Sequence, residues 1–102
     1  MKKIYIAGKV TGENQMECAY KFAAAQEELE KHGFEAVNPL EVVGDWETPW
    51  EIAMPLCLAA LETCDAIFML PDYIHSRGAL IEKGRAIELG FHVLIHIGNG
   101  KV

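Results

Sequence analysis

The chain has 102 residues, of which 51% are hydrophobic and 24% are charged, and its formal net charge is −6. These values are typical of one globular domain, so we expect residues 1–102 to form a single domain. They argue against a membrane protein, because no apolar run approaches the roughly 20 residues of a membrane-spanning helix, and against binding to nucleic acid polymers, because the acidic chain lacks a basic stripe.

The N-terminus and the cysteines indicate a reducing, cytoplasmic location. Residues 1–8 begin with basic side chains but contain no apolar segment long enough for a signal peptide. An odd number of cysteines without a CxxC spacing argues against a disulfide framework. The four histidines form no zinc-ligand spacing with the cysteines. We therefore predict no metal site and no cofactor.

Short apolar runs alternate with helical patterns along the chain. The apolar runs, read as strands, cover residues 3–7, 34–37, 66–70 and 91–97, and the last run ends at a turn over residues 98–100. The helical patterns cover residues 13–32, 49 to about 63, and 77–89, and loops are expected at residues 40–48 and 71–76. Such alternation predicts an α/β fold, a three-layer doubly wound sheet of about four parallel strands. The expected flavodoxin-like or Rossmann-like strand order is 2-1-3-4.

Periodicity also predicts which helical residues face the core. In the first helical pattern Thr11 or Gly12 is expected to be the N-cap. In the second, Pro55 places the start of the regular helix near Ala53, because proline lacks the amide donor of a helix interior. The residues predicted to face inward, from their three- and four-residue steps, are Met16, Ala19, Tyr20, Ala23 and Leu29 in the first pattern and Ile52, Leu56, Ala59, Ala60 and Leu61 in the second.

Polar residues gather where the first and third strands end. In this fold class ligands bind beyond the carboxyl ends of the strands, at the point where the strand order reverses. That point places the turn at residues 8–12 beside the loop at residues 71–76, with Asn38 nearby. The 8–12 turn lacks the GxxxxGK[ST] phosphate-loop pattern, so its glycines indicate a tight turn or a close approach. Ser76 can cap the last helix, whose free N–H groups would form an anion site.

The sequence pattern alone does not decide which side chains take part in chemistry. Glu82 is either a surface carboxylate at the edge of a packed face or a working acid. Tyr5 is consistent with an ordinary strand aromatic, and His75 is a weak general acid–base candidate. A phospho-receiver domain would need acidic residues after the first strand, and a flavin-binding domain would need a Ser/Thr-rich loop there. The chain has Gly8 and a single hydroxyl, Thr11, at that place, so both alternatives are set aside.

Four segments together resemble a known family. They are Ile4-Tyr5-Ile6-Ala7-Gly8, Asn38-Pro39, Cys64-Asp65-Ala66-Ile67, and Ser76-x-Gly78-Ala79-x-x-Glu82 with Ala86 and Leu89-Gly90 after it. Over essentially the whole chain they are similar to the nucleoside 2-deoxyribosyltransferase superfamily, most closely to its short bacterial and phage branch. The resemblance implies a doubly wound α/β fold. It also implies cleavage or transfer at the N-glycosidic bond of a 2′-deoxynucleoside or its 5′-monophosphate.

The resemblance also implies roles for individual residues. Glu82 would be the nucleophile of a retaining displacement, in contact with Tyr5. Ser76 stands where hydrolases of deoxynucleoside monophosphates carry a serine and transferases an acid, which favours a phosphorylated ligand. The residues expected around the substrate are Ser76, Arg77, Gly78 and Ala79 at the phosphate, Gly8 at the sugar, Tyr73 or Trp46 at the base, and Asn38 close by.

The proton donor for the leaving base departs from the family pattern. The family carries an aspartate ahead of the third strand at a position that is Cys57 here, and a thiol with a pKa near ~8.5 is a poor general acid. Asp72, His75 and Asp45 are the candidate donors. The same departure leaves open a nucleotide-binding or sensing module without turnover, and a purely structural domain. The resemblance further implies a homo-oligomer whose partner is a small-molecule nucleoside or nucleotide.

Overall fold

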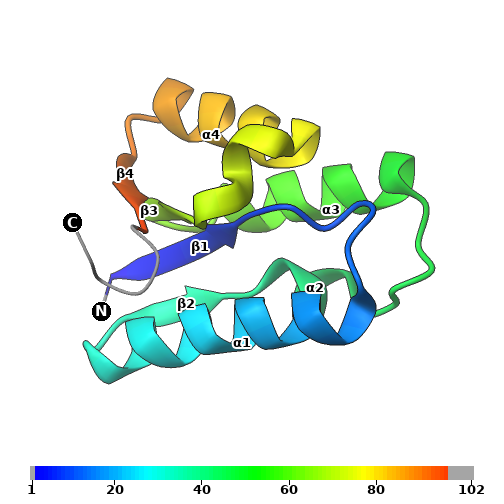
Figure 1. Cartoon of the computed structure of the whole chain (residues 1–102). Coiled ribbons are helices and arrows are strands. Elements are labelled where there is room, and N and C mark those ends of the chain that lie inside the picture. Colours follow the sequence, from blue (N-terminus) through cyan, green and yellow to red (C-terminus); the bar gives the residue numbers. More distant parts are fainter. Residues whose placement is uncertain (1, 97–102) are drawn as a thin grey trace.

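The computed structural model describes residues 2–96, which form a parallel sheet with helices on both faces (Figure 1). The strands are β1 (Lys3–Ala7), β2 (Glu35–Val37), β3 (Ala66–Met69) and β4 (His92–Ile95). They pair in parallel in the order β2-β1-β3-β4. This confirms the predicted α/β class and strand order. The predicted end of the last strand at residue 97 and the turn at residues 98–100 lie outside the described residues.

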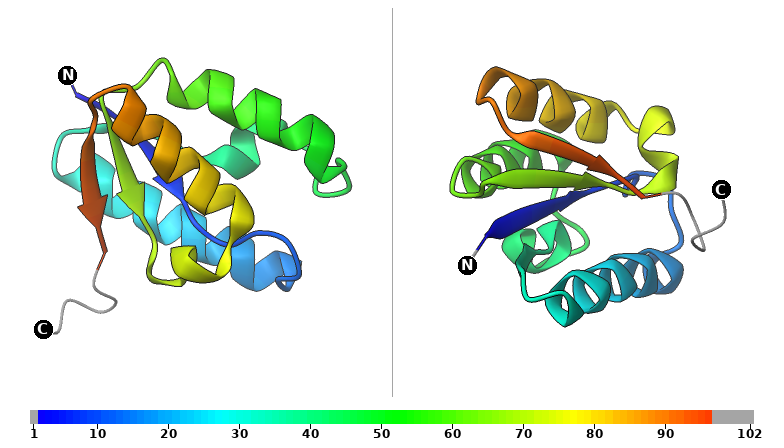
Figure 2. Two further views of the ribbon diagram at one scale, coloured as in Figure 1. Left: turned by 90° about the horizontal axis from the view of Figure 1, so that it is seen from above. Right: turned by 90° about the vertical axis from the view of Figure 1, so that its left-hand side faces the viewer.

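The helices are α1 (Gln15–Lys31), α2 (Pro39–Val43), α3 (Trp50–Leu61), the 3₁₀ helix η1 (Pro71–His75) and α4 (Arg77–Glu88). In Figures 1 and 2, α1 lies on one face of the sheet, and α3 and α4 lie on the other. Within residues 2–96, none of these helices is both long and apolar enough to cross a membrane. The side chains of β1 alternate between the two layers: Ile4 and Ile6 pack with α1, whereas Tyr5 and Ala7 pack with α3 and α4.

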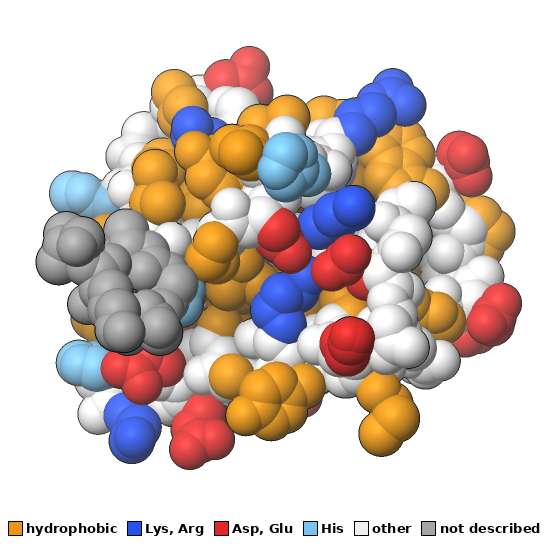
Figure 3. Space-filling model, in the orientation of Figure 1, with side chains coloured by type: hydrophobic (Ala, Val, Ile, Leu, Met, Phe, Trp, Pro, Cys, Tyr) orange, Lys and Arg blue, Asp and Glu red, His pale blue; other side chains and the backbone are white. Residues whose placement is uncertain are grey.

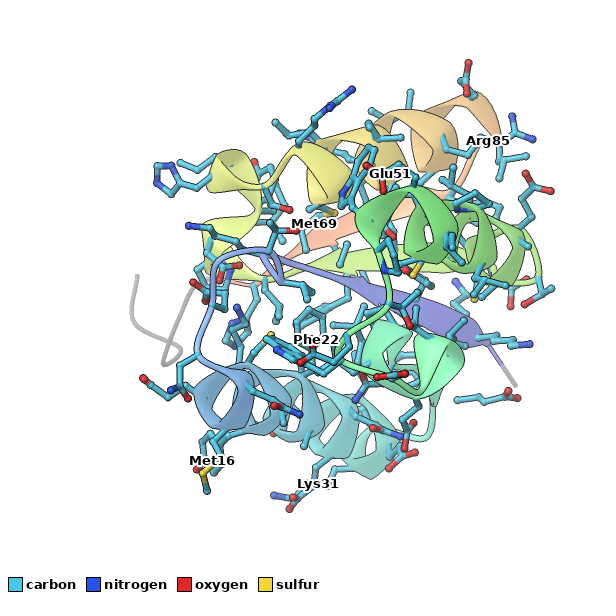
Figure 4. The ribbon with its side chains drawn as sticks, turned by 90° about the vertical axis from the view of Figure 1, so that its right-hand side faces the viewer. Met16, Phe22, Lys31, Glu51, Met69 and Arg85 are labelled. Atoms are coloured by element: carbon cyan, nitrogen blue, oxygen red, sulfur yellow. The ribbon has the colours of Figure 1, made fainter. Side chains whose placement is uncertain are left out.

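The face of α1 that contacts the sheet differs from the predicted one. Met16 and Tyr20 are 83% and 77% exposed, and Figure 4 shows Met16 pointing away from the sheet that Phe22 points toward. Leu29 is buried as predicted, but with Cys18, Phe22 and Ala25 it forms a second stripe at equally good helical spacing. Because both stripes satisfy the periodicity, only packing against the sheet decides between them. The N-cap is Asn14, whose side chain accepts the N–H of Glu17, and not Thr11 or Gly12.

The predicted 40–48 loop contains a short helix. The Asn38 side chain accepts the N–H of Leu40 and caps α2, and Pro39 occupies the first turn, where its missing N–H is not needed. Gly44 ends the helix in the left-handed conformation with φ of 81°. The Asn-Pro pair that stops β2 therefore also starts a helix.

The helix α3 begins at Trp50, where the helical segment was predicted to open, but it is regular from there and includes Pro55, rather than becoming regular only near Ala53. Proline is tolerated there because its absent N–H would have bonded the carbonyl of Glu51 in the first turn, which faces water. The predicted inward face is confirmed at Leu61, and Ala60 packs against the same core, but the other predicted residues are not buried. Ile52, Leu56 and Ala59 are exposed, and the buried residues of α3 are Cys57 and Leu61.

Candidate active site

A cavity of about 450 Å³ opens beyond the carboxyl ends of the strands, where the strand order reverses. Its lining comes from the loop after β1, from the start of α1, from α2 and the connection that follows it, from α3, and from the first turns of α4. Of the residues singled out by the sequence, the lining includes Gly8, Asp45, Trp46, Ser76, Gly78, Ala79 and Glu82. The doubly wound topology therefore places one group of predicted residues around one hollow, as expected.

Glu82 lines this cavity, and Tyr5 lies buried behind it. The Tyr5 hydroxyl donates a hydrogen bond of 2.6 Å to Glu82 Oε2. The exposed fractions of the two residues are 0% and 5%. Tyr5 points from β1 toward α4, and Glu82 lies on the face of α4 that also buries Ala79 and Ala86. Glu82 is therefore not a surface carboxylate.

Burial shifts the protonation of the central groups. Burial raises the pKa of Glu82 from 4.5 to about 7, although the hydrogen bond from Tyr5 opposes the shift. Burial, and then the charge of Glu82, raise the pKa of Tyr5 well above its usual value. Near neutral pH the glutamate can thus exchange its proton while the phenol stays protonated, which suits a nucleophile held by a permanent donor.

Cys57 is the third group of this site. It lies on the buried face of α3 and lines the cavity. Burial raises the pKa of its thiol to about 11, an effect that the nearby Tyr5 hydroxyl partly offsets. The position that departs from the family pattern therefore faces the cavity, with a thiol that keeps its proton at neutral pH.

The first turn of α4 forms one wall of the cavity. The Ser76 Oγ accepts the N–H of Ala79 at 3.1 Å, so Ser76 is the helix cap that the sequence predicts. A Cβ atom at Gly78 would lie 3.1 Å from the Sδ of Met54, so the close approach of α4 to α3 favours glycine here. A Cβ atom at Gly8 would lie 2.7 Å from Leu70 Cδ1. Packing against Leu70 is therefore a structural reason for the glycine at position 8.

A second depression adjoins the cavity and shares Thr11, Trp50, Ser76 and Gly78 with it. The charged and titratable side chains of its lining are Lys9, Glu51, His75 and Arg77. The Arg77 guanidinium lies over the Trp50 ring, 4.8 Å from the ring centroid. The predicted residues His75 and Arg77 thus lie beside the cavity rather than in it, at the N-terminal end of α4.

Asp72, a predicted proton donor, is part of an ionic cluster next to the cavity. Its Oδ1 accepts the N–H of Lys9 at 3.1 Å and its Oδ2 accepts from Lys21 Nζ at 2.6 Å. Lys21 Nζ also donates to the Lys9 carbonyl and to Glu13. Figure 3, in the orientation of Figure 1, shows basic and acidic side chains side by side near the middle of the visible surface. With both carboxylate oxygens accepting hydrogen bonds, Asp72 ties the loop after β1 to η1 and is held away from the cavity lining.

Two other predicted residues do not line the cavity. Asn38 is buried as the cap of α2, and its amide also donates to Gln26 Oε1 at 3.2 Å. Tyr73 packs against the core, and Lys83 Nζ lies 5.0 Å from the centroid of its ring. Of the two aromatic residues proposed for the base, only Trp46 therefore reaches the cavity.

Of the residues that α3 contributes to the cavity, Cys57 was singled out from the sequence, whereas Trp50 and Met54 were not. Trp50, Met54 and Cys57 line the cavity at steps of four and three residues, on a helix face other than that of Ile52 and Leu56. This spacing is visible in the sequence, but Ile52 and Leu56 form an equally regular stripe. Among the described residues, no group of three or more His, Cys, Asp or Glu side chains is arranged to hold a metal ion.

Comparison with known proteins identifies a matching sequence family and a solved structure with a similar fold. The sequence model of a family described as a domain of unknown function, DUF4406, matches residues 2–95. No curated protein matches the sequence. One similar solved structure is that of the Clostridium botulinum CMP N-glycosidase BcmB, with a TM-score of 0.63 and 18% sequence identity over 98% of this chain and 75% of that chain. At this identity the likeness shows a shared fold.

Proposed function

This chain belongs to the DUF4406 family of domains of unknown function, and we propose that it cleaves the N-glycosidic bond of 2′-deoxynucleosides or their 5′-monophosphates through Glu82. The main support is the buried hydrogen bond of 2.6 Å from Tyr5 to Glu82, a glutamate that lines a cavity of substrate size. The similar fold of a protein described as a CMP N-glycosidase supports the same class of reaction. The sequence resemblance to nucleoside 2-deoxyribosyltransferases is a further support.

In this proposal the reaction is a retaining double displacement. The ionised carboxylate of Glu82 attacks C1′ and the base leaves, which gives a glycosyl ester on Glu82. Water, or a second base in a transfer reaction, then attacks the same carbon and releases the carboxylate. Tyr5 holds the carboxylate in one orientation. Because the pKa of Glu82 is about 7, the activity should rise with pH through about pH 7.

The depression beside the cavity is our proposed site for the 5′-phosphate. The α4 N–H groups that follow Ser76 carry the positive end of the helix dipole, and Arg77 and Lys9 add positive charge on the same side. A phosphate there would leave the sugar facing Glu82 and the base facing Trp46. The ligand would thus extend over both hollows.

Base release from a panel of nucleosides and nucleotides tests the proposal. The panel contains ribose and 2′-deoxyribose compounds, with and without the 5′-phosphate, and chromatography measures the free base. Wild type should release base, and Glu82→Gln should lower the rate at least about 10³-fold because it removes the nucleophile. Glu88→Gln is the matched control on the same helix, because Glu88 is exposed and outside the cavity. A Glu82→Gln rate equal to that of wild type would contradict the proposal.

A nucleotide-binding module without turnover is the second candidate. Its support is Cys57, which puts a weakly acidic thiol where a carboxylic acid would serve as proton donor. It predicts no base release but a saturable rise in melting temperature with a nucleotide, which Glu82→Gln reduces. The homo-oligomer stays a prediction, and light scattering of the purified protein measures it.

A further inference from the structure

The cavity around Glu82 is acidic in its formal charges. Among the residues that line it, the charged side chains are Asp45 and Glu82, and Lys, Arg and His are absent from this part of the described chain. The neighbouring depression has the opposite character, with Lys9, Arg77 and His75 against a single acid, Glu51. The two hollows therefore favour charges of opposite sign within one ligand.

Aromatic rings add to the preference of the cavity for positive charge. The indoles of Trp46 and Trp50 both line it, and the face of an indole attracts a cation within about 6 Å. The Trp50 ring already has the Arg77 guanidinium at 4.8 Å. A planar cation in the cavity would meet an aromatic ring and the Glu82 carboxylate together.

Apart from Glu82, Asp45 is the one carboxylic acid among the described residues that line the cavity. Asp45 is exposed, and its Oδ1 accepts the N–H of Glu47. Tyr5 already donates to Glu82, and Cys57 holds its proton up to a pKa of about 11. A neutral base such as guanine needs a proton as it leaves, and a positioned acid typically contributes about 10²–10⁴-fold to such a step. A base that is a permanent cation needs none.

We propose that the base bound beside Glu82 is a fixed cation, so that the substrate is a nucleotide of an N-glycosylated pyridinium or an N7-alkylated purine. The cation would lie among Trp46, Trp50 and Glu82, and the phosphate in the depression at Lys9 and Arg77. This inference rests on the proposed function and narrows its substrate class. The lining of both hollows supports it independently of the fold relative.

The reaction balances without a general acid. A carboxylate oxygen of Glu82 bonds to C1′ as the bond from C1′ to the ring nitrogen breaks, and that electron pair neutralises the cationic ring. The base leaves neutral. Water then attacks C1′ of the glycosyl ester, the carboxylate is restored, and one proton goes to solvent. Before the first step, a cation a few ångströms from Glu82 would lower the pKa of the carboxyl and keep the nucleophile ionised.

Matched substrate pairs test the inference with the intact protein. Guanosine 5′-monophosphate and its N7-methyl derivative differ by one methyl group and one charge, and nicotinamide mononucleotide separates the pyridinium class from the purine class. Each rate is divided by the rate without enzyme, because N7-methylation itself weakens the bond. We expect the enhancement for the cations to be about 100-fold larger than for guanosine 5′-monophosphate. An equal or larger enhancement for the neutral substrate would overturn the inference and leave the proposed function standing.

Substitutions at the cavity provide a second test. Cys57→Asp adds a carboxylic acid and should raise the rate on the neutral substrate at least about 10-fold without raising it on the cations, whereas Cys57→Asn is the uncharged control. If wild type cleaves neither series, the proposed function fails. In that case the binding affinities of the two nucleosides test the preference for a cationic base separately. At least about 10-fold tighter binding of N7-methylguanosine than of guanosine, lost in Glu82→Gln, supports the cationic ligand, and equal binding overturns it.

Discussion

The substitution Glu82→Gln should make the protein more stable at alkaline pH and remove much of its pH dependence. Glutamine keeps the shape of a protonated glutamic acid and an oxygen that can accept from Tyr5, but it cannot ionise. In the wild type, burial raises the pKa of Glu82 from 4.5 to about 7. The unfolded chain therefore loses this proton near its ordinary pKa, whereas the folded protein keeps it up to about pH 7.

The sign of the effect follows from the number of bound protons. Between these two pKa values the folded state binds more protons than the unfolded state, so the free energy of unfolding falls as the pH rises. The shift from 4.5 to about 7 corresponds to about 3 kcal/mol when the titration is complete. Glu82 is 5% exposed, so screening by solvent reduces this value little. The stabilising effect of Glu82→Gln should thus be about 2–3 kcal/mol larger at about pH 8 than at about pH 5.

Urea denaturation at several pH values measures this difference. The fluorescence of Trp46 and Trp50 reports unfolding, and Glu88→Gln controls for the loss of one exposed carboxylate on α4. Other titrating groups are the same in the wild type and the variants, so they cancel in the comparison. A free-energy difference between wild type and Glu82→Gln that is the same at both pH values would refute the reasoning. It would mean that Glu82 has an ordinary pKa in the folded protein.

Four further substitutions probe the site and the packing around it. Tyr5→Phe should lower the rate of base release about 10–100-fold. It should also move the pH midpoint of activity upward, because Glu82 loses the hydrogen bond that lowers its pKa. An unchanged pH–rate profile would contradict this. Ser76→Ala should lower the unfolding free energy by about 1 kcal/mol through the lost helix cap, measured in urea. Gly8→Ala should lower the free energy of unfolding by about 1–3 kcal/mol, because the added Cβ meets Leu70. Gly84→Ala should raise it by about 0.5–1 kcal/mol, because an added Cβ there meets nothing within 4 Å. Equal melting temperatures of the two variants would contradict the packing argument.

Local patterns in the sequence were enough for the topology and for the start of α4. Apolar runs that alternate with helical repeats leave little choice but a parallel, doubly wound sheet, since crossovers between parallel strands are right-handed and short. The order 2-1-3-4 and the cap at Ser76 were predicted from such patterns and are present. The short helix α2 was missed although Asn38 and Pro39 carry its start signals, because the same pair is a good strand terminator.

Only the tertiary structure decided between alternatives that the local sequence patterns support equally well. In α1 and α3 two stripes of residues have the same helical spacing, and contact with the sheet selects Phe22 over Tyr20 and Cys57 over Leu56. The bond between Tyr5 and Glu82 joins residues 77 positions apart, so no local pattern contains it. The sequence by itself determines that a glutamate follows a capped turn beside the strand ends. The packing of α4 on β1 decides that this glutamate is buried against a phenol, because burial and a raised pKa arise only when distant elements exclude water together.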